Sequence, residues 1–566
     1  APGGPPPPSG HRPDRAAPES GVSDAAPLRL PLTPAQADAW RRASAAWAGG
    51  QSTVLLHGVT GSGKTMVYGQ AVAETLARGS QAILLDPEIS RPSQGAACFT
   101  ARFGPRVAVV HSGLKPAEKL AIWDKCLRAE LQILVGARSA VFAPFPRLGL
   151  IVLDEEHDGA YKQDENPKYH ARDVARRRLP HGLVILGSAT PSLEAYAAAA
   201  RKQIERVLLP ARFNQSPLPA ITVVDMKLEL AAGNRSVLSL PLRDALTALL
   251  ERGEQAVLFL NRRGYATFIL CRECGHVVSC PHCDVALTYH QKTDAVRCHY
   301  CNHRENAVKR CPRCGSRYIR HFGQGTEKVE EAVRALWPQA RVLRLDRDAA
   351  AEARGPENIL AGFRRREADI LIGTQMLAKG LDFPDVTLVG IVAADQMLGL
   401  PDFRARERAF QLFMQVAGRA GRGQRTGTVI LQTYAPEDRT VMHAANYDYD
   451  LFAREELAYR RERRYPPFAH MLRLMVFHDS EAKAIKAALA LARALEAEIA
   501  GENPRLRLLG PAPAVLTRLK NEYRWQIILQ GRDPAELRRA AHRGTSAFYR
   551  GSEAGGIRLS LDIDPL

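Results

Sequence analysis

The sequence predicts an α/β fold: two lobes built on parallel sheets, a cysteine-rich module inserted in the second lobe, and an α+β domain at the C-terminal end. Three observations predict it. Short β-branched runs alternate with helical stretches in two successive sets, eight cysteines interrupt the second set, and the pattern changes after about residue 450. At roughly 150 residues per domain, 566 residues allow about three to five such units.

The first lobe is expected over residues 29–205, after a Pro-rich stretch at 1–28 that we predict to be a disordered linker. Strand-like runs separated by helical stretches are the pattern of crossover connections in a parallel sheet. We expect its strands at Thr53–His57, Ala82–Asp86, Val107–His111, Ile133–Val135, Leu150–Asp154 and Leu183–Gly187.

The second lobe is expected over residues 206–450, with the cysteine module inserted at 269–318. Its apolar runs show the same alternation, so a second parallel sheet is predicted. We expect its strands at Ala256–Leu260, Arg341–Leu345, Ile370–Gly373, Val386–Val392 and Gly427–Gln432.

The last domain is expected over residues 451–566 and opens with an Arg/Glu-rich helical stretch that stops at Tyr465-Pro466-Pro467-Phe468. The segments beyond this breaker mix helical and strand patterns, which is typical of an α+β domain. We expect a helix at Ala482–Ile499 and strands at Met471–Phe477, Leu506–Leu509, Trp525–Gln530 and Ile557–Ile563.

A phosphate-binding loop is predicted directly after the first strand. The run Gly58-Val59-Thr60-Gly61-Ser62-Gly63-Lys64-Thr65 matches G-x-x-x-x-G-K-[ST] and precedes a helical stretch. Its glycines let backbone N–H groups cradle phosphates, Lys64 can reach the β- and γ-phosphates, and the Thr65 hydroxyl can ligate Mg²⁺. A chance match in a Gly-rich chain is the alternative, which the preceding strand disfavours. We therefore assign a nucleotide site to Gly58, Gly61, Ser62, Gly63, Lys64 and Thr65.

A second phosphate motif ends the strand at Leu150–Asp154. The sequence there reads Asp154-Glu155-Glu156-His157. Asp154 is placed to hold Mg²⁺ and Glu155 to polarise the attacking water. Acidic residues at a strand end are often only a solvated turn, but the phosphate-binding loop earlier in the lobe favours the catalytic interpretation.

Two arginines from the second lobe supply positive charge. Arg419 and Arg422 lie three apart in the run Gln415–Arg422, which we expect to place them on one helix face. From there they could reach a γ-phosphate across a cleft between the lobes. Hydrolysis would then depend on closure of the two lobes.

These motifs carry a family resemblance. Lys64 in its loop, Asp154–His157, Ser188-Ala189-Thr190 and Gln415–Arg422 resemble the ordered motifs of superfamily 2 helicases. Further segments narrow the resemblance to the PriA family of replication-restart helicases (primosomal protein N′), over residues 30 to 566. These segments are Pro87-Glu88-Ile89, His111-Ser112-Gly113, Gly136–Ala140, Tyr161-Lys162-Gln163, Tyr169–Asp173, Asn261–Tyr265, Gly325-Thr326-Glu327, Gly373–Met376 and Asp402–Ala405.

The resemblance implies that both lobes are RecA-like and that ATP and Mg²⁺ are cofactors. It implies that Asp154 and Glu155 activate hydrolysis and that three residues of the second lobe, Gln415, Arg419 and Arg422, contact the triphosphate. Gln36 is expected near adenine, Gly380 and Asp382 at the ATP site, and Ser188 and Thr190 in the coupling of hydrolysis to DNA movement.

The resemblance also implies DNA contacts. Residues 158–170 are similar to the family's aromatic-rich loop, which senses single-stranded DNA. Tyr161 and Tyr169 offer stacking faces, and Lys162 and Lys168 offer phosphate contacts, although tyrosines in a polar loop more often serve packing. The last domain carries 20 Lys/Arg against 14 Asp/Glu and is expected to bind DNA. There the resemblance points to Lys520, Tyr523 and Arg524.

Four Cys-x-x-Cys pairs between Cys271 and Cys314 predict two structural Zn²⁺ sites, because four thiolates leave no position for an activated water. Sequential pairing would join the first two pairs across five residues, whereas nested pairing leaves 14 residues between Cys283 and Cys298, close to zinc-ribbon spacing. We favour nested pairing, which the resemblance also implies: Cys271, Cys274, Cys311 and Cys314 at one site, and Cys280, Cys283, Cys298 and Cys301 at the other. The alternative ligands are His282, His290, His299 and His303; Cys98 and Cys126 are expected to be buried apolar residues.

Three departures from the family pattern stand out. Arg91-Pro92-Ser93-Gln94 replaces the usual Leu-Thr-Pro-Gln, so the family's DNA contacts at that loop are not carried over to this chain. Leu381 replaces a common histidine beside the retained Asp382, so we expect coupling to be altered in degree rather than lost. PriA proteins also carry an N-terminal region that captures a nascent 3′ end, followed by a winged-helix domain. Only about thirty Pro-rich residues precede the motor here, so we do not expect fork-end recognition from this chain. The first residue is Ala1 rather than methionine, so we expect a processed product or a fragment of a longer one.

Charge and composition bear on the partner. The formal charge of +18 favours a polyanion, with simple solubility as the alternative. The sequence contains no apolar run of about 18 residues and no signal peptide, so we expect a cytoplasmic protein without a membrane partner.

The resemblance implies an ATP-dependent 3′-to-5′ DNA helicase that remodels stalled forks and initiates primosome assembly and replication restart. Its expected partners are single-stranded and forked DNA, primosome proteins, single-stranded-DNA-binding protein and the replicative helicase loader, and we expect a monomer. One alternative is a fork-binding scaffold that does not unwind DNA. Another, the motor of a nuclease, lacks a nuclease carboxylate cluster in the sequence.

Overall fold

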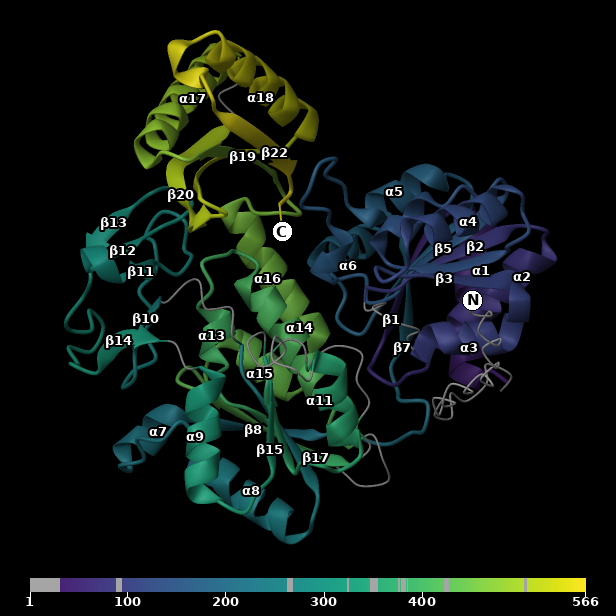
Figure 1. The fold of residues 1–566 in the computed structure, drawn as a ribbon, viewed down its shortest axis with the longest axis horizontal. Helices are drawn as coiled ribbons and strands as arrows, with labels where there is room; N and C mark the ends of the chain where they lie inside the picture. Colours follow the sequence, from purple (N-terminus) through teal and green to yellow (C-terminus); the bar gives the residue numbers. More distant parts are fainter. Residues whose placement is uncertain are drawn as a thin grey trace, which may run out of the picture.

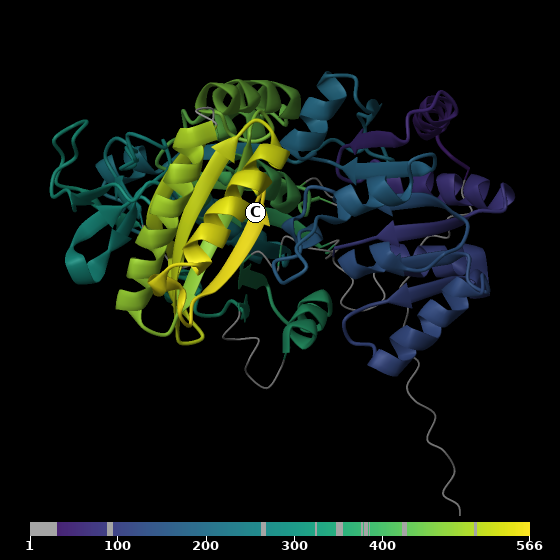
Figure 2. The same ribbon diagram turned by 90° about the horizontal axis from the view of Figure 1, so that it is seen from above.

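The computed structural model describes residues 31–87, 94–261, 268–322, 325–346, 355–374, 377, 383, 385–421, 427–502 and 506–565. The predicted linker at 1–28, Gly380, Leu381, Asp382, Arg422 and residues 91–93 lie outside these ranges. Figures 1 and 2 show the first lobe beside a second group of three parts: the second lobe, the cysteine module and the C-terminal domain. In the described part of the chain, none of the helices is both long and apolar enough to span a membrane.

The first lobe is built on a seven-stranded parallel sheet of order β3-β4-β2-β5-β6-β1-β7. Alternate residues of a central strand serve opposite faces: Val54 and Leu56 pack with helices α1 and α2, and Leu55 packs in the cluster on the other face. The strands are β1 (Thr53–Gly58), β2 (Gln81–Leu85), β3 (Val107–Val110), β4 (Ile133–Gly136), β5 (Leu148–Leu153), β6 (Leu183–Ser188) and β7 (Glu205–Leu209). The helices are α1 (Pro34–Ala48), α2 (Lys64–Ala77), α3 (Gln94–Phe103), α4 (Pro116–Leu127), α5 (Ala171–Arg178) and α6 (Leu193–Ala200).

The second lobe has a six-stranded parallel sheet of order β15-β16-β9-β17-β18-β8. Its strands are β8 (Ala220–Asp225), β9 (Gln255–Phe259), β15 (Val342–Leu345), β16 (Ile370–Gly373), β17 (Val386–Ile391) and β18 (Thr428–Thr433). The helices are α7 (Met226–Ala231), α8 (Leu240–Glu251), α9 (Thr326–Leu336), α11 (Gly355–Arg364), α13 (Asp395–Leu398), α14 (Ala405–Ala417) and α15 (Arg439–Ala445). The predicted division at residue 205 is too early, because β7 still pairs with β1 and the second sheet begins only at β8.

The cysteine module leaves the second lobe after β9 and forms an antiparallel sheet of order β13-β12-β11-β10-β14. Its strands are short: β10 (Phe268–Cys271), β11 (Thr288–His290), β12 (Ala295–Arg297), β13 (Arg304–Asn306) and β14 (Ile319–Phe322). The long helix α16 (Tyr449–Arg463) then runs from the second lobe toward the C-terminal domain (Figure 1).

The C-terminal domain is an antiparallel sheet of order β20-β21-β19-β22. Alternation along β19 gives the sheet two buried faces: Leu472 and Leu474 pack with the two helices, and Met471 packs in the core of the cysteine module. The elements are β19 (His470–His478), α17 (Glu481–Glu502), β20 (Arg507–Leu519), β21 (Glu522–Gly531), α18 (Pro534–Tyr549) and β22 (Arg558–Ile563).

A buried ion pair joins helix α16 to both lobes. Arg460 of α16 is fully buried, and its guanidinium lies 2.7 Å from Glu407 Oε2 of α14 and 3.2 Å from Glu456 Oε1. The other oxygen of Glu407 accepts a hydrogen bond of 2.9 Å from the Leu193 backbone N–H at the start of α6, in the first lobe. One carboxylate therefore contacts all three parts.

Removal of this cation tests the joint. Arg460→Ala leaves Glu407 and Glu456 buried without their partner, which should lower the free energy of unfolding by about 3–5 kcal/mol. Urea unfolding followed by circular dichroism measures the loss. The neighbouring Arg461 is exposed and only covers the ring of Phe468, at 4.8 Å, so Arg461→Ala should cost no more than about 1 kcal/mol. Equal losses in the two variants would contradict the role of the buried pair.

Candidate functional site

The predicted phosphate-binding loop lies between β1 and α2. Gly61 and Gly63 have φ angles of +81° and +80°, in the left-handed region that favours glycine, and a Cβ at Gly63 would lie 2.3 Å from Gln36 Nε2. Lys64 is buried and its Nζ donates to the Gly58 carbonyl at 3.1 Å. Ser62 Oγ is buried and has no hydrogen-bond partner among the described residues. Such a cradle, with an unsatisfied hydroxyl, fits a phosphate group.

Gln36 is tied directly to this loop. Its Nε2 donates to the Ser62 carbonyl at 3.1 Å, while its Oε1 accepts from the Thr33 backbone N–H at 3.0 Å in a capping box at the start of α1. A second segment also covers the loop, since the Phe213 N–H donates to the Gly61 carbonyl at 2.8 Å. Phe213 was not predicted to lie at this site, because its position shortly after the edge strand β7 carries no motif.

The carboxylate of Asp154 lies at the end of β5 beside this cradle. Its Oδ1 accepts from the Tyr68 hydroxyl at 2.9 Å and from the Glu155 N–H at 3.0 Å. Burial, together with the neighbouring charge of Glu155, raises the pKa of Asp154 to about 7, and Lys64 opposes this rise. Tyr68 was also missed; a Cβ at Gly187 would lie 1.7 Å from its hydroxyl, so only glycine leaves room for it.

His157 connects the two lobes. Its Nδ1 lies 2.7 Å from Ser188 Oγ, and its Nε2 lies 3.1 Å from Gln415 Nε2 of α14. If the Gln415 amide donates, the proton of His157 is on Nδ1, which then donates to Ser188. Ser188 also accepts from the Thr190 N–H at 3.0 Å, so two predicted coupling residues are joined to the second lobe through one imidazole.

The expectation that Arg419 lies on a helix face is wrong, and Arg422 lies outside the described residues. Helix α14 ends at Ala417, and Gly421 has a φ of +64°, so Arg419 lies in the turn that follows the helix. This turn lies against the phosphate-binding loop, because a Cβ at Gly418 would lie 2.9 Å from Thr60 Cγ2. The second lobe thus approaches the loop as predicted, but through a turn.

Glu156 has a structural role, because it binds the start of helix α6. It is buried and accepts from the Ser192 N–H at 2.6 Å and from Ser192 Oγ at 3.0 Å, at the start of α6. Arg172 lies 3.6 Å from the same carboxylate. Glu156 therefore caps a helix of its own lobe and does not face the phosphate-binding loop.

The prediction that Tyr161 stacks on DNA is wrong for this conformation. Its side chain is fully buried, and its hydroxyl donates to the carbonyls of Asp154, at 2.6 Å, and Leu85, at 2.9 Å. Tyr169 is half-buried, with its ring 4.9 Å from that of Phe142. Lys162 and Lys168 point to the C-terminal domain, where both lie beside Asp562.

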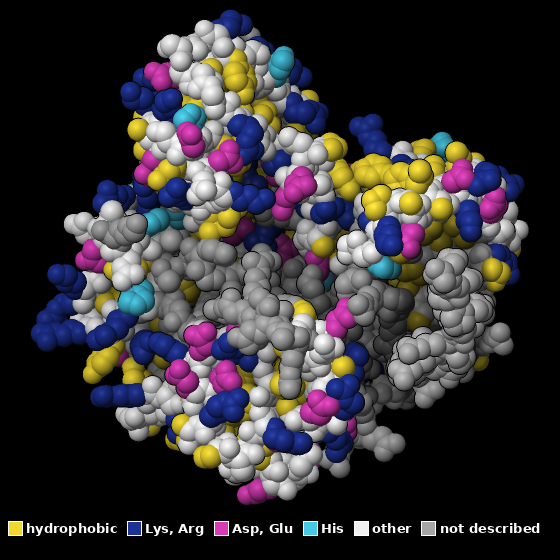
Figure 3. Space-filling view, in the orientation of Figure 1, with side chains coloured by type: hydrophobic (Ala, Val, Ile, Leu, Met, Phe, Trp, Pro, Cys, Tyr) yellow, Lys and Arg dark blue, Asp and Glu magenta, His cyan; other side chains and the backbone are white. Residues whose placement is uncertain are grey.

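The other predicted DNA contacts lie together at one hairpin. Lys520 and Asn521 form the two-residue turn between β20 and β21 with positive φ angles of +51° and +64°. Tyr523 stacks under Arg518 at 5.2 Å, and Arg524 donates to the Leu516 carbonyl at 2.7 Å. Lys and Arg side chains are spread over this domain and the cysteine module (Figure 3).

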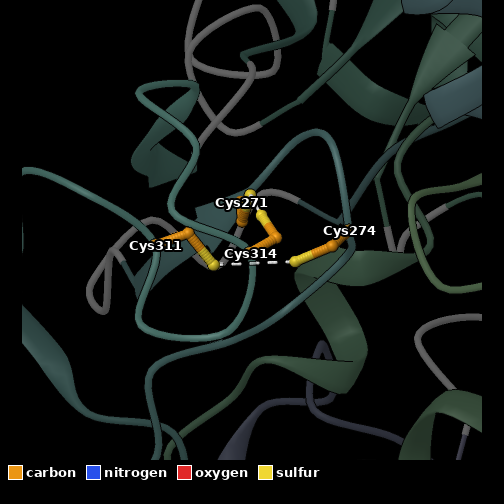
Figure 4. A group of neighbouring side chains, drawn as sticks. All are labelled: Cys271, Cys274, Cys311 and Cys314. Carbon is orange, nitrogen blue, oxygen red and sulfur yellow. Dashed lines mark hydrogen bonds between the residues drawn. The ribbon is translucent and has the colours of Figure 1, made fainter.

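The eight cysteines form the two nested groups that the spacing favours. In each group the four sulfurs lie within 4.8 Å of one another, and one group is drawn in Figure 4. The Sγ atoms of Cys271 and Cys314 are 3.7 Å apart and those of Cys280 and Cys301 are 3.6 Å apart, close to the roughly 3.8 Å that tetrahedral Zn–S bonds of about 2.3 Å require. Both donor sets therefore fit Zn²⁺.

A repeated backbone turn shapes these groups. The residue after each Cys-x-x-Cys pair has a positive φ and its N–H bonds to the carbonyl of the first cysteine. Glycine, aspartate and asparagine tolerate this conformation, and they are the types present: Gly275, Asp284, Asn302 and Gly315. The histidines considered as alternative ligands belong to neither group; His299, for example, is buried with its Nδ1 2.8 Å from the Pro513 carbonyl.

Comparison with known proteins follows the same division of the chain. Residues 33–198 match the DEAD/DEAH box helicase family and residues 317–424 the helicase conserved C-terminal domain. Residues 280–305 match the PriA DNA helicase Cys-rich region domain and residues 461–566 the primosomal protein N C-terminal domain.

Curated relatives named replication restart protein PriA align along most of the chain. The protein of Bacillus subtilis is 45% identical over 90% of this chain and 63% of its own length, and that of Synechocystis is 45% identical over 94% and 64%. The protein of Treponema pallidum is 40% identical over 91% of this chain and 77% of its own length. The chain thus spans somewhat under two thirds of the first two relatives. A solved structure of RecG bound to a three-way DNA junction matches with a TM-score of 0.45 and 16% identity, over 76% of this chain and 47% of that one.

The cysteine groups predict a metal content. The purified protein should contain two Zn²⁺ per chain by plasma mass spectrometry, and a Cys298→Ser/Cys301→Ser variant should contain one. Cys98→Ser, outside both groups, serves as the control and should retain two. Loss of both ions in the first variant would show that the two groups do not bind metal independently.

His57, which precedes the phosphate-binding loop, predicts a pH dependence of stability. Burial lowers the pKa of His57 from 6.5 to about 4, and the charge of Arg206 contributes to this shift. The Arg206 Nη2 atom lies 2.7 Å from His57 Nδ1. Below pH 6.5 His57 is protonated in the unfolded chain but stays neutral in the folded chain. The contribution of His57 to the free energy of unfolding is therefore fully present above that pH, and it falls between pH 6.5 and pH 4 by up to about 1.4 kcal/mol per pH unit. His57→Gln should flatten this fall in the thermal midpoint, whereas the exposed His181→Gln should not.

Proposed function

The chain belongs to the PriA family of replication restart proteins, and we propose that it is an ATP-driven DNA helicase that acts at stalled replication forks. The proposal includes movement in the 3′-to-5′ direction and initiation of primosome assembly. Its proposed partners are forked and single-stranded DNA, single-stranded-DNA-binding protein, other primosome proteins and the replicative helicase loader, all in the bacterial cytoplasm.

The approach of the second lobe to the phosphate-binding loop is the observation that carries the proposal. The contact from His157 to Gln415, at 3.1 Å, and the turn at Gly418 against Thr60 bring α14 to the loop that would hold ATP. A nucleotide site shared between two lobes opens and closes with them. Such a site suits a motor, because hydrolysis then changes the position of one lobe relative to the other.

The proposed roles follow from these positions. The loop from Gly58 to Thr65 binds the phosphates, with Gln36 at its entrance, and Lys64 stabilises the charge of the β- and γ-phosphates. Thr65 and Asp154 would hold Mg²⁺, which neutralises phosphate charge when bound. Glu155 orients the attacking water, and Gln415, Arg419 and Arg422 reach the γ-phosphate from the second lobe.

Coupling to DNA is proposed to run through the same imidazole. Ser188 is the last residue of β6 and Thr190 follows it, and Ser188 contacts His157 at 2.7 Å. Displacement of Gln415 on lobe opening would release His157 and, through it, the segment that leads into α6. The cysteine module acts as a rigid spacer, since its core packs on both the second lobe and the C-terminal sheet.

Replacement of the loop lysine tests the nucleotide site. Lys64→Ala should reduce DNA-stimulated ATP hydrolysis by at least about 100-fold, because the triphosphate loses its main cation, while zinc content and circular dichroism stay unchanged. Lys125→Ala, on an exposed face of α4, is the matched control and should retain full activity.

Partial duplexes with either a 3′ or a 5′ tail, mixed with ATP and Mg²⁺, test the helicase activity and its direction. Strand separation on the 3′-tailed substrate alone supports the proposal. Binding without separation would support a fork-binding scaffold instead, and cleavage would indicate a nuclease motor.

A further inference from the structure

The last strand of the chain holds a segment of the first lobe through a buried carboxylate. Asp562 of β22 has a side chain only 1% exposed, and its Oδ1 lies 2.9 Å from Lys162 Nζ. Lys168 Nζ lies 3.6 Å from its Oδ2, and Arg473 of β19 lies 3.5 Å from the same oxygen. Lys162 also donates to the Ile563 carbonyl at 2.6 Å. Three cations thus share one carboxylate.

The segment that Asp562 holds is connected to the main chain of Asp154, the residue that carries the proposed catalytic carboxylate. Tyr161 precedes Lys162, and its hydroxyl donates to the Asp154 carbonyl at 2.6 Å. Arg138 stiffens the same turn, since it donates to the Ala160 carbonyl at 2.9 Å and to that of Lys162. A displacement of Lys162 therefore moves its neighbour in the chain, Tyr161, and the Tyr161 hydroxyl transmits this displacement to Asp154 through its hydrogen bond.

The cations around Asp562 could bind a more highly charged anion in place of its carboxylate. One carboxylate leaves the three cations with a net excess of positive charge. The walls of the adjoining cavity of about 880 Å³ add three arginines, Arg177, Arg178 and Arg538, and one carboxylate, Asp173. A nucleic-acid backbone brings several phosphates, and Lys and Arg bind these electrostatically without regard to sequence. Phosphate groups would thus compete with Asp562 for Lys162 and Lys168.

We propose that Asp562 is a positioning residue that holds Lys162 and Lys168 against the C-terminal domain until single-stranded DNA displaces it. This inference rests on the proposed function. In the DNA-free protein the two lysines pair with Asp562, and in the DNA complex they contact phosphate. The segment at Lys162 moves with them and carries the signal toward Asp154.

The test removes the competing charge at constant size. Asp562→Asn should lower both the dissociation constant for a fluorescent oligothymidylate, measured by anisotropy without nucleotide, and the DNA concentration for half-maximal ATP hydrolysis, each by about three- to tenfold. The maximal rate at saturating DNA should stay within about twofold of the unmodified protein. A merely structural role would reduce the maximal rate or the thermal midpoint and would leave DNA affinity unchanged or weaker.

Two further variants keep the proposal testable if Asp562→Asn does not fold. Arg473→Gln leaves Asp562 to the two lysines alone and should weaken DNA binding by about two- to threefold. Asp564→Asn is the matched control: its carboxylate lies on the same chain end but bonds to His470, at 2.7 Å, and to the Met471 N–H, at 3.0 Å, within the C-terminal domain. It should bind DNA as the unmodified protein does.

The outcomes separate this inference from the proposed function. Equal or weaker DNA binding by Asp562→Asn, with a folded protein, would overturn the inference, and so would tighter binding by Arg473→Gln. Absence of DNA-stimulated hydrolysis in the unmodified protein would contradict the proposed function, whereas the binding measurement would still decide the role of Asp562.

Discussion

The carboxylate of Glu407 is the contact on which the arrangement of the three main parts depends. It belongs to α14 of the second lobe, pairs with Arg460 of the helix that leads to the C-terminal domain, and accepts from the Leu193 N–H of the first lobe. Because the Arg460 side chain is fully buried and that of Glu407 nearly so, neither can exchange this contact for water at low cost. The pair therefore sets where α14 lies, and the other end of α14 carries Gln415 and the turn that abuts the phosphate-binding loop. The position of Gln415 at the nucleotide site therefore depends on the contact of Glu407 with Arg460, about two helical turns away along α14.

The zinc centres extend this arrangement rather than add a separate function to it. The Tyr465 hydroxyl, just after the helix that carries Arg460, donates to the Cys283 carbonyl at 2.8 Å, and Gln526 of the C-terminal sheet donates to the His299 carbonyl at 2.7 Å. Two turns beside metal ligands thus hold the C-terminal domain. Zinc coordination by the thiolates fixes the shape of these turns. Zinc binding is therefore expected to stabilise the interface with the C-terminal domain as well as the cysteine module itself. Coordination by four thiolates, which leaves no open position on the metal, fits this purely structural use.

Much of the fold could be predicted from the sequence because central strands of parallel sheets are buried on both faces and appear as continuous apolar runs. The strands of the two parallel sheets that were missed, β7 and β8, are edge strands with partly exposed residues such as Leu208 and Thr222, so their signal is weaker. The strands of the cysteine module were not predicted either, because they are only three or four residues long. The nested cysteine pairs could be predicted because the ligand spacing of a zinc ribbon is local. By contrast, the end of α14 at Gly418 and the burial of Tyr161 could not. Tyr161 lies among polar neighbours and is buried only because two main-chain carbonyls, of Asp154 and Leu85, satisfy its hydroxyl.

Three contacts of the first lobe with its neighbours lie at the carboxyl ends of the strands of its sheet. The carboxyl ends of β5 and β6 carry His157, Lys162 and Leu193, which meet Gln415, Asp562 and Glu407 respectively. Parallel strands place their carboxyl ends together, and the phosphate-binding loop follows β1 at this same edge. A change in the charge bound at the loop therefore acts within a few residues of the contacts to the second lobe and to the C-terminal domain. In a parallel sheet no long-range path is needed to link nucleotide state with domain position, because topology has already put the two at the same edge.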